Sequence, residues 1–237
     1  MAARRPEIIA HRGTPREHPE NSLPGFAHAL ALGADAIELD VHLTADGVPV
    51  VHHDAELGRR TDDGAFAGTP IVDLTRDALR AHELAPGVRV PTLAEVCDLA
   101  AGRATIYVEV KARGAGAAVA AALAGLRDSA PVHSFDHRVS RHVRALAPDT
   151  PVGVLSTSYL VDTTAAMRAA DARDLWQHWT MIDAALVDAV HAAGGRVIVW
   201  TVNDPAVARD LAALGVDGLC TDVPGQIAAA VGALPRP

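Results

Sequence analysis

Ionisable side chains interrupt a valine- and leucine-rich, strand-like stretch, AIELDVHLTADGVPVVHHD (residues 36–54). They are Glu38, Asp40, His42, His52, His53 and Asp54. Carboxylates bind hard cations, and imidazoles exchange protons near neutral pH. The stretch is therefore either a site of chemistry or, in the simpler interpretation, a solvated hairpin whose charges face water.

The Asp46-Gly47 pair within this stretch predicts a tight hairpin turn, because both residues accept the backbone conformation that such turns require. A two-residue turn there places Asp40 opposite His53. Because side chains alternate along a strand, we expect Glu38, Asp40 and His53 on one face, with the Cβ atoms of Asp40 and His53 within roughly 5 Å.

Two other strand-like runs also end in polar residues. EIIAHR ends in His11 and Arg12, and TIYVEVK ends in Glu109 and Lys111. Active residues of parallel barrels gather where the carboxyl ends of the strands meet. We therefore expect these side chains to share one rim with the charged hairpin.

The residue types at this rim indicate phosphate chemistry. Glu38, Asp40 and Glu109 form an all-oxygen, triply anionic set that suits one divalent cation, Mg²⁺ or Ca²⁺, better than zinc. Arg12 and Lys111 beside that cation suit an anion with several oxygens, for which phosphate is the natural candidate.

His11 and His53 complete the set as a base and an acid, one neutral and one protonated. Which histidine plays which role is open, because the sequence does not orient a substrate. A cation, two basic side chains and two histidines together indicate phosphoryl transfer without an enzyme nucleophile.

The elements that must position these residues follow a βαβα pattern, in which β-rich runs alternate with alanine- and leucine-rich segments of helical period. The predicted strands are residues 7–11, 36–40, 105–110, 132–135, 151–155, 175–181, 196–202 and 218–222. The predicted helices include residues 22–33, 92–102, 115–126, 137–147, 183–195 and 204–215. This α/β pattern predicts a (β/α)₈ TIM barrel, with an open doubly wound sheet as the alternative.

One segment interrupts the alternation of predicted strands and helices. Residues 55–91, which follow His53-Asp54, are rich in Gly, Pro and Asp and contain a single short helical piece at 73–82. We interpret the segment as a short insertion over one face of the barrel, and residues 1–237 as one domain.

The composition limits the kinds of partner that the protein is expected to bind. The net charge of −8 gives no overall attraction to nucleic acid, and no apolar run approaches the roughly 18 residues of a membrane span. Neither a signal peptide nor a stable membrane anchor is predicted, so we expect a cytoplasmic protein. Cys97 and Cys220 lack metal-type spacing and are expected to be buried apolar residues.

With these motifs in place, the sequence resembles the glycerophosphodiester phosphodiesterase family of the phospholipase C-like barrel superfamily. The resemblance runs in order across nearly the whole chain. It rests on AHRG (10–13), PENS (19–22), GADAIELDVHLTADGVPVVHHD (33–54), VEVK (108–111), SF (134–135), VWTVN (199–203) and GVDGLCTDVP (215–224). Ser22 stands where the family usually has threonine, and its hydroxyl can still cap the following helix.

The resemblance implies metal-dependent hydrolysis of glycerophosphodiesters to sn-glycerol 3-phosphate and an alcohol. It assigns His11 and His53 to the catalytic histidines and Arg12 and Lys111 to the phosphate contacts. The implied metal ligands are Glu38, Asp40 and Glu109. His52 beside His53 leaves an ambiguity that the hairpin count resolves in favour of His53.

Further residues have either a supporting role at the site or a structural one. Glu20 and Asn21 either cap the first helix or support the site, and Asp54 is expected to orient His53. Phe135 belongs to a matched motif, and Trp200 either walls the glycerol pocket or sits in the core. We expect His42 to be exposed. The histidines without an evident partner are expected on the surface or on helices: His18, His28, His82, His133, His137, His142 and His191.

The expected mechanism begins with His11 removing the proton of the glycerol 2-hydroxyl, which attacks phosphorus while His53 protonates the departing alcohol. Water then opens the cyclic phosphate with the roles reversed. A lysophospholipase D or sphingomyelinase D-like enzyme using the same site is the main alternative, although it needs an apolar approach that 3% aromatic residues do not suggest. A silent phosphodiester binder and a metal-dependent sugar phosphate lyase or isomerase are weaker alternatives.

Overall fold

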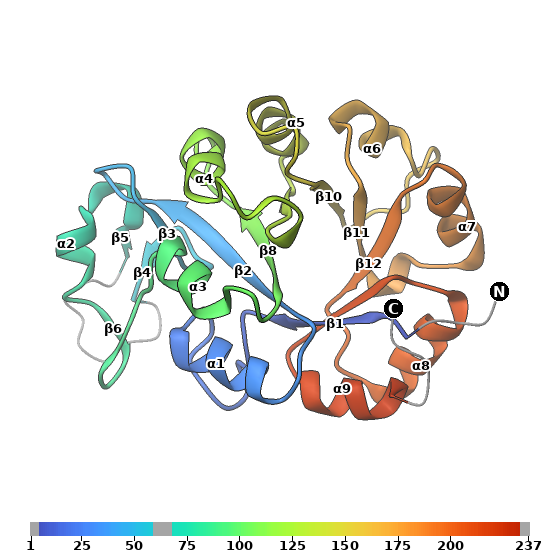
Figure 1. The fold of residues 1–237 in the computed structure, drawn as a ribbon, viewed down its shortest axis with the longest axis horizontal. Coiled ribbons are helices and arrows are strands. Elements are labelled where there is room, and N and C mark those ends of the chain that lie inside the picture. Colours follow the sequence, from blue (N-terminus) through green and yellow to red (C-terminus); the bar gives the residue numbers. More distant parts are fainter. Residues whose placement is uncertain (1–4, 59–67, 233–237) are drawn as a thin grey trace.

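A closed parallel barrel forms the centre of the molecule in the computed structural model, which describes residues 5–58 and 68–232 (Figure 1). The strands are hydrogen-bonded in the order β1-β13-β12-β11-β10-β9-β8-β2, and β1 pairs with β2 to close the ring. Their bounds are β1 Glu7–His11, β2 Ala36–Leu43, β8 Thr105–Val110, β9 Val132–Ser134, β10 Val152–Ser156, β11 Asp174–His178, β12 Arg196–Trp200 and β13 Gly218–Thr221. The predicted barrel is confirmed.

Helices follow the strands and cover the outside of the barrel (Figure 1). Their bounds are α1 Leu23–Ala31, α3 Leu93–Ala100, α4 Gly116–Ala122, α5 His137–Leu146, α6 Ala165–Ala170, α7 Ala184–Ala192, α8 Pro205–Leu214 and α9 Pro224–Val231. Short 3₁₀ turns lie at Arg127–Ser129 and at Trp179–Met181, the latter where we expected β11 to continue. Ser22 caps α1 as predicted, since its Oγ accepts a hydrogen bond from Gly25 N at 3.2 Å.

Apolar side chains pack in two layers. Inside the barrel, Ile9, Tyr107, Trp176 and Ile198 belong to one buried cluster. Between the strands and the surrounding helices, two larger clusters of mainly aliphatic residues complete the core. The buried interior is what holds the rim of the barrel in a fixed shape.

The charged hairpin is antiparallel, but its predicted register is wrong by one residue. Val41 pairs with Val51 in β3 (Pro49–Val51), and His52 N donates to Asp40 O at 3.0 Å, so Asp40 lies opposite His52. The loop has three residues instead of two, because Thr44 N donates to Val48 O and Gly47 adopts φ +78°. A three-residue loop that ends in a left-handed glycine is the next commonest hairpin connection.

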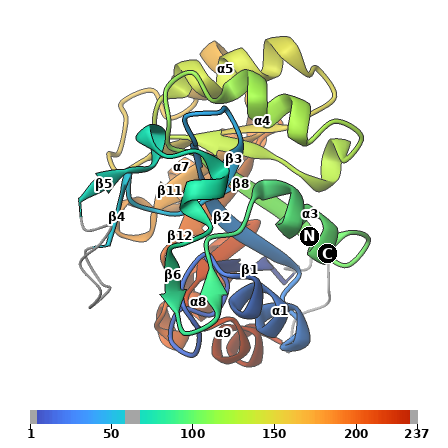
Figure 2. The ribbon, with the colours of Figure 1, turned by 90° about the vertical axis from the view of Figure 1, so that its left-hand side faces the viewer.

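The insertion after His53-Asp54 forms small elements beside β3 (Figures 1 and 2). They are β4 Glu56–Leu57, β5 Thr69–Pro70, the 3₁₀ turn Ile71–Asp73, α2 Arg76–Leu79, β6 Glu83–Ala85 and β7 Val88–Arg89. Val50 of β3 joins Leu57, Ile71 and Leu79 in a separate buried cluster, which fastens the insertion to the barrel. The predicted helical piece at 73–82 contains one turn of helix, α2.

Helices able to span a membrane were sought in the described ranges, and none is both long and apolar enough.

Candidate active site

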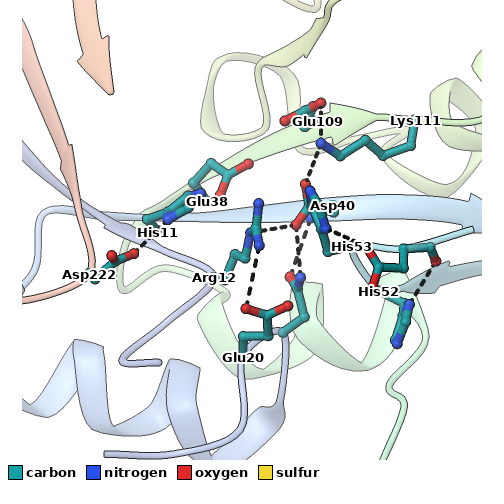
Figure 3. Close-up of polar contacts among 12 residues, drawn as sticks. His11, Arg12, Glu20, Glu38, Asp40, His52, His53, Glu109, Lys111 and Asp222 are labelled. Atoms are coloured by element: carbon teal, nitrogen blue, oxygen red, sulfur yellow. Dashed lines mark hydrogen bonds and ion pairs between the residues drawn. The ribbon is translucent and has the colours of Figure 1, made fainter. Parts of the chain in front are cut away.

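Strand register brings the predicted groups together at the carboxyl ends of neighbouring strands. His11 pairs with Glu38 across β1 and β2, and Asp40 pairs with Glu109 across β2 and β8. In Figure 3 these side chains converge on one region with Arg12 and Lys111. The predicted site is therefore assembled by parallel pairing, in which aligned residues point to the same side of the sheet.

His133 also belongs to this rim, contrary to our expectation that it lies on the surface or on a helix. It pairs with Glu109 across β8 and β9 and is only 1% exposed. Its ring stacks on Trp176 with a centroid distance of 4.0 Å and an interplanar angle of 4°. Its Nε2 lies 3.7 Å from Glu38 Oε1. Its position within the predicted strand 132–135 was the signal in the sequence that could have placed it in the barrel.

Glu38, Glu109 and His133 form a group that could hold a divalent cation. One ligand atom from each lies within 4.8 Å of the others, and all three residues are buried. Among the described residues, Glu38 Oε2 and both ring nitrogens of His133 have no hydrogen-bond partner. Buried polar atoms normally have a partner, so a cation fits this cluster.

Asp40, the third predicted ligand, lies between the two predicted phosphate-binding cations. Its Oδ2 is 3.0 Å from Arg12 Nε, and its Oδ1 is 3.1 Å from Lys111 Nζ. Asn21 Nδ2 donates to Oδ2 at 2.8 Å, which places Asn21 in support of the site. Lys111 Nζ also contacts Glu109 Oε1 at 2.6 Å.

The two neighbouring carboxylates experience opposite electrostatic surroundings. Burial would raise the pKa of Asp40, but the charges of Arg12 and Lys111 lower it well below its usual value. Burial and then the charge of Asp40 raise the pKa of Glu109, against the opposing effect of Lys111. Glu109 is thus the carboxylate that would gain most from a nearby cation.

The loop after β1 adopts an uncommon backbone conformation. Arg12 and Asn21 have φ values of +55° and +56°, and Arg12 O accepts a hydrogen bond from Asn21 N at 3.0 Å. Gly13 has φ +88°, and a Cβ there would lie 2.7 Å from the carbonyl carbon of Gly25. This close approach to α1 aims the Arg12 guanidinium at Asp40 and Glu20, whose Oε2 it meets at 3.4 Å.

His11 is held by a residue that the sequence analysis did not single out. His11 Nδ1 lies 2.7 Å from Asp222 Oδ1, and Asn203 Nδ2 donates to Asp222 Oδ2 at 2.6 Å. A carboxylate only accepts hydrogen bonds, so the Nδ1 proton stays in place and Nε2 is left as the basic nitrogen. Asp222 directly follows β13, and its place at a strand end was an available signal.

The pKa of His11 is set by competing effects. Burial lowers it, whereas the hydrogen bond to Asp222 and the charge of Glu38 raise it, and the net result lies above the ordinary value. The imidazole is therefore a stronger base than a free histidine.

His53 lies next to Asp40 and His11 lies beside Glu38, while His52 points away from the cluster (Figure 3). Because β3 ends at Val51, strict alternation stops before these residues, and His53 reaches the site despite the shifted register. His53 Nδ1 lies 2.9 Å from Asp54 Oδ1, the distance that an orienting partner requires.

Two further histidines near this hairpin differ from expectation. His42 is buried with 8% exposure, and its Nε2 lies 3.0 Å from the backbone oxygen of His53, so it supports the loop instead of facing water. His82, expected on the surface or on a helix, is 1% exposed. It lines a cavity of about 190 Å³ that also borders His53, Asp54 and Glu56.

Aromatic rings lie at the edge of the site next to Lys111. Lys111 Nζ lies 5.9 Å from the ring centroid of Phe135, and Phe135 meets Trp200 edge to face with centroids 5.4 Å apart. Trp200 is half-buried at the end of β12 and packs against the buried cluster inside the barrel, so it lies between the rim and the core. Cys97 and Cys220 are buried as expected.

Barrel and site together define a class: α/β barrels in which acidic, basic and histidine side chains gather at the carboxyl rim, where such barrels place their active sites. Residues 11–226 match the model of the glycerophosphoryl diester phosphodiesterase family. The chain belongs to this family and is a phosphoric diester hydrolase.

Individual relatives agree with this assignment. A glycerophosphodiester phosphodiesterase of Caldanaerobacter subterraneus subsp. tengcongensis is 31% identical over 92% of this chain and 94% of its own length. An Oleispira antarctica phosphodiesterase, solved with the product sn-glycerol-3-phosphate, is 26% identical with a TM-score of 0.88, covering 96% of this chain and 97% of that one. A glycerophosphodiester phosphodiesterase of Agrobacterium tumefaciens is 27% identical with a TM-score of 0.83, covering 94% and 99%.

Proposed function

We propose that this enzyme hydrolyses small glycerophosphodiesters to sn-glycerol 3-phosphate and an alcohol, with His11 and His53 as the proton-transfer groups. The observation that carries the proposal is a cluster in which Arg12 and Lys111 flank Asp40, with His11 beside Glu38 on the neighbouring strand and His53 next to Asp40 (Figure 3). Such an arrangement fits a phosphate in the middle, with the entering and leaving oxygens at the two imidazoles.

The first step follows from the support of His11. Its Nε2 takes the proton of the glycerol 2-hydroxyl, because Asp222 fixes the Nδ1 proton and strengthens the base. The 2-oxygen then bonds to phosphorus, and the bond from phosphorus to the head-group oxygen breaks. His53, oriented by Asp54, gives its proton to the departing alcohol.

In the second step the roles reverse. His53 takes a proton from water, the water oxygen bonds to phosphorus, and His11 returns the first proton to the 2-oxygen as the ring opens. Arg12 and Lys111 hold the phosphate through both steps by charge-assisted hydrogen bonds. Ser134 supports attack by the substrate itself, since its hydroxyl donates to Val110 O and is not available as an enzyme nucleophile.

A divalent cation, Mg²⁺ or Ca²⁺, bound by Glu38 and Glu109 with Asp40 or His133, would supply a Lewis acid that offsets charge on the phosphate oxygens.

The experiment is release of sn-glycerol 3-phosphate from a panel of glycerophosphodiesters by wild type and His11→Ala, each with and without chelator. We expect release by wild type, loss with chelator, and a fall of about 10²–10⁴-fold in His11→Ala. Activity that survives both chelator and mutation would refute the site. A substrate analogue without the 2-hydroxyl that is cleaved at full rate would refute internal attack.

A further inference from the structure

A groove lies between the insertion and the outside of the barrel, and its volume is about 360 Å³. One wall comes from α2, β7 and the residues after β7, and the other from the first turns of α1 and α3. Figure 2 shows the insertion beside these helices. The lining residues are separate from the side chains labelled in Figure 3. A space of this size can hold a small organic molecule.

Three arginines line this groove: Arg76 and Arg80 at the two ends of α2, and Arg89 in β7. Arg80 and Arg89 are exposed and form no ion pair within residues 5–58 and 68–232. Arg76 Nη1 lies 3.7 Å from Asp77 Oδ1, and its Nη2 lies 3.9 Å from Glu95 Oε1. Both distances are too long for a hydrogen bond, so all three guanidinium groups retain donors for an anion.

Glu95 is the one acid among the described lining residues, and it already has partners. Its Oε2 accepts hydrogen bonds from Thr92 N at 2.8 Å and from Thr92 Oγ1 at 2.9 Å, in the capping box of α3. Three arginines and one carboxylate leave an excess of two positive charges in the groove. This local excess stands out in a protein whose net charge is −8.

Apolar side chains form the floor of the groove. Val50, Leu79 and Val90 line it and belong to the buried cluster that fastens the insertion to the barrel. Leu23 and Val88 extend this apolar surface toward the two walls. The groove therefore combines an apolar floor with a positively charged edge, which suits a molecule that has an apolar body and an anionic head.

Backbone contacts hold the two walls in place. Val51 N donates to Pro91 O at 2.8 Å, and Val50 forms an isolated bridge with Thr92. Arg76 N donates to Asp46 Oδ1 at 2.9 Å, which ties α2 to the tip of the charged hairpin. A ligand would meet a groove that is already formed, so little ordering of the chain would oppose binding.

We propose that this groove binds a small phosphate monoester with an apolar body, whose phosphate lies at the three arginines and whose body lies on the apolar floor. A phosphate monoester carries about two negative charges at neutral pH, which matches the positive excess. The guanidinium forks fit its oxygens in pairs. A carboxylate would leave one positive charge unmatched. The site is independent of the proposed function, because the groove and the catalytic cluster share no residue.

The test is titration calorimetry at slightly alkaline pH with phenylphosphonate, a stable mimic of such an ester, in the presence of Mg²⁺. Inorganic phosphate supplies the head without the body, and benzoate supplies the body with a single charge. We expect the Kd of phenylphosphonate to be about tenfold lower than that of either. Equal affinity for inorganic phosphate would overturn the role of the floor, and equal affinity for benzoate would overturn the choice of phosphate.

Arginine variants locate the binding. Arg80→Gln and Arg89→Gln should each weaken phenylphosphonate binding about tenfold and leave turnover of glycerophosphoethanolamine unchanged. Arg209→Gln, at an exposed position on α8, is the matched control and should bind normally. Lys111→Gln, in the catalytic cluster, should also retain binding at the groove. Binding that is lost in Lys111→Gln but kept in Arg80→Gln would place the probe at the catalytic cluster and overturn the proposal.

A variant of the floor separates ligand contact from general distortion. Val88→Thr keeps the shape of the side chain and makes it polar. We expect it to weaken phenylphosphonate binding about threefold and to leave inorganic phosphate binding unchanged. Equal weakening of both probes would contradict the predicted contact between the body and the floor.

Two further outcomes separate the alternatives. Binding to phosphatidylglycerol vesicles that is lost in Arg80→Gln, without binding of phenylphosphonate, would assign the arginines to a lipid surface and overturn the proposal. Failure to hydrolyse glycerophosphoethanolamine would count against the proposed function, whereas normal hydrolysis without binding of phenylphosphonate would count against this inference alone.

Discussion

Asp222 illustrates how a residue can govern chemistry through its neighbour. It contacts Nδ1 of His11 and is itself held by Asn203 on both its side chain and its backbone nitrogen, the latter at 2.9 Å. We interpret Asp222 as a positioning residue, which sets the tautomer and the basicity of His11.

The pH profile tests this role. His11 acts as base only when neutral, so activity should fall as the pH drops below its pKa, which Asp222 raises. In Asp222→Asn we expect the acidic limb of kcat/KM to move to lower pH and kcat to fall about tenfold or more. The control is Asp217→Asn, which alters another histidine–aspartate pair, with His191 at 2.9 Å. An unshifted limb in Asp222→Asn would contradict the role.

The identity of the metal ligands can also be decided residue by residue. The sequence predicts Asp40 as the third metal ligand beside Glu38 and Glu109. In the structure, His133 is the residue that lies close enough to both to share a cation with them. If His133 is a ligand, His133→Phe should lower the affinity for Mg²⁺ or Ca²⁺ at least tenfold by titration calorimetry, while a ring remains to stack on Trp176. His178→Phe, outside the cluster, should bind normally. Unchanged affinity in His133→Phe would exclude it and favour Asp40.

At the scale of elements, the hairpin shows what a local sequence pattern can and cannot predict. Asp46-Gly47 correctly indicated the turn. The predicted register was wrong because contacts made by Thr44 lengthen the loop. Its backbone oxygen accepts a hydrogen bond from Gly47 N, and its hydroxyl donates to Asp46 Oδ1 at 2.6 Å. His53 remained at the site only because β3 ends before it.

Gly47 should carry a measurable part of the hairpin's stability. Its φ of +78° strains any residue with a Cβ, although nothing lies within 4 Å of that position. Gly47→Ala should therefore lower the free energy of unfolding by about 1 kcal/mol in urea titration. Gly225→Ala, in α9 with only ordinary contacts, should leave stability unchanged or raise it slightly. Equal effects at both positions would contradict the backbone argument.

Regular strands were predictable, whereas two helices were not. Hydrophobic runs located every barrel strand, because a buried parallel strand has few alternatives to apolar residues. Helices α6 and α9 are short and alanine-rich, and neither has a side-chain hydrogen bond at its N-cap. Pro224 at the start of α9 was an available signal, whereas packing against the barrel has to define where α6 begins.

For the whole molecule, the sequence predicted the barrel and most of the rim, because the strand ends and the ionisable residues at them could both be recognised. His133 and Asp222 were missed because their importance depends on which strands are neighbours. The pairing of β9 with β8 places His133 beside Glu109, and the closure of the ring through β13 places Asp222 beside His11. Closure is a property of the fold that no single segment contains.

The most direct test of the central claim is phosphorus-31 NMR of glycerophosphoethanolamine turnover in ¹⁸O-labelled water with added divalent cation. The proposal predicts that phosphate stays on the glycerol as sn-glycerol 3-phosphate carrying one labelled oxygen. It also predicts that a cyclic glycerol phosphate, added separately, is hydrolysed to the same product. Formation of phosphoethanolamine and free glycerol, or a cyclic phosphate that is not consumed, would contradict it.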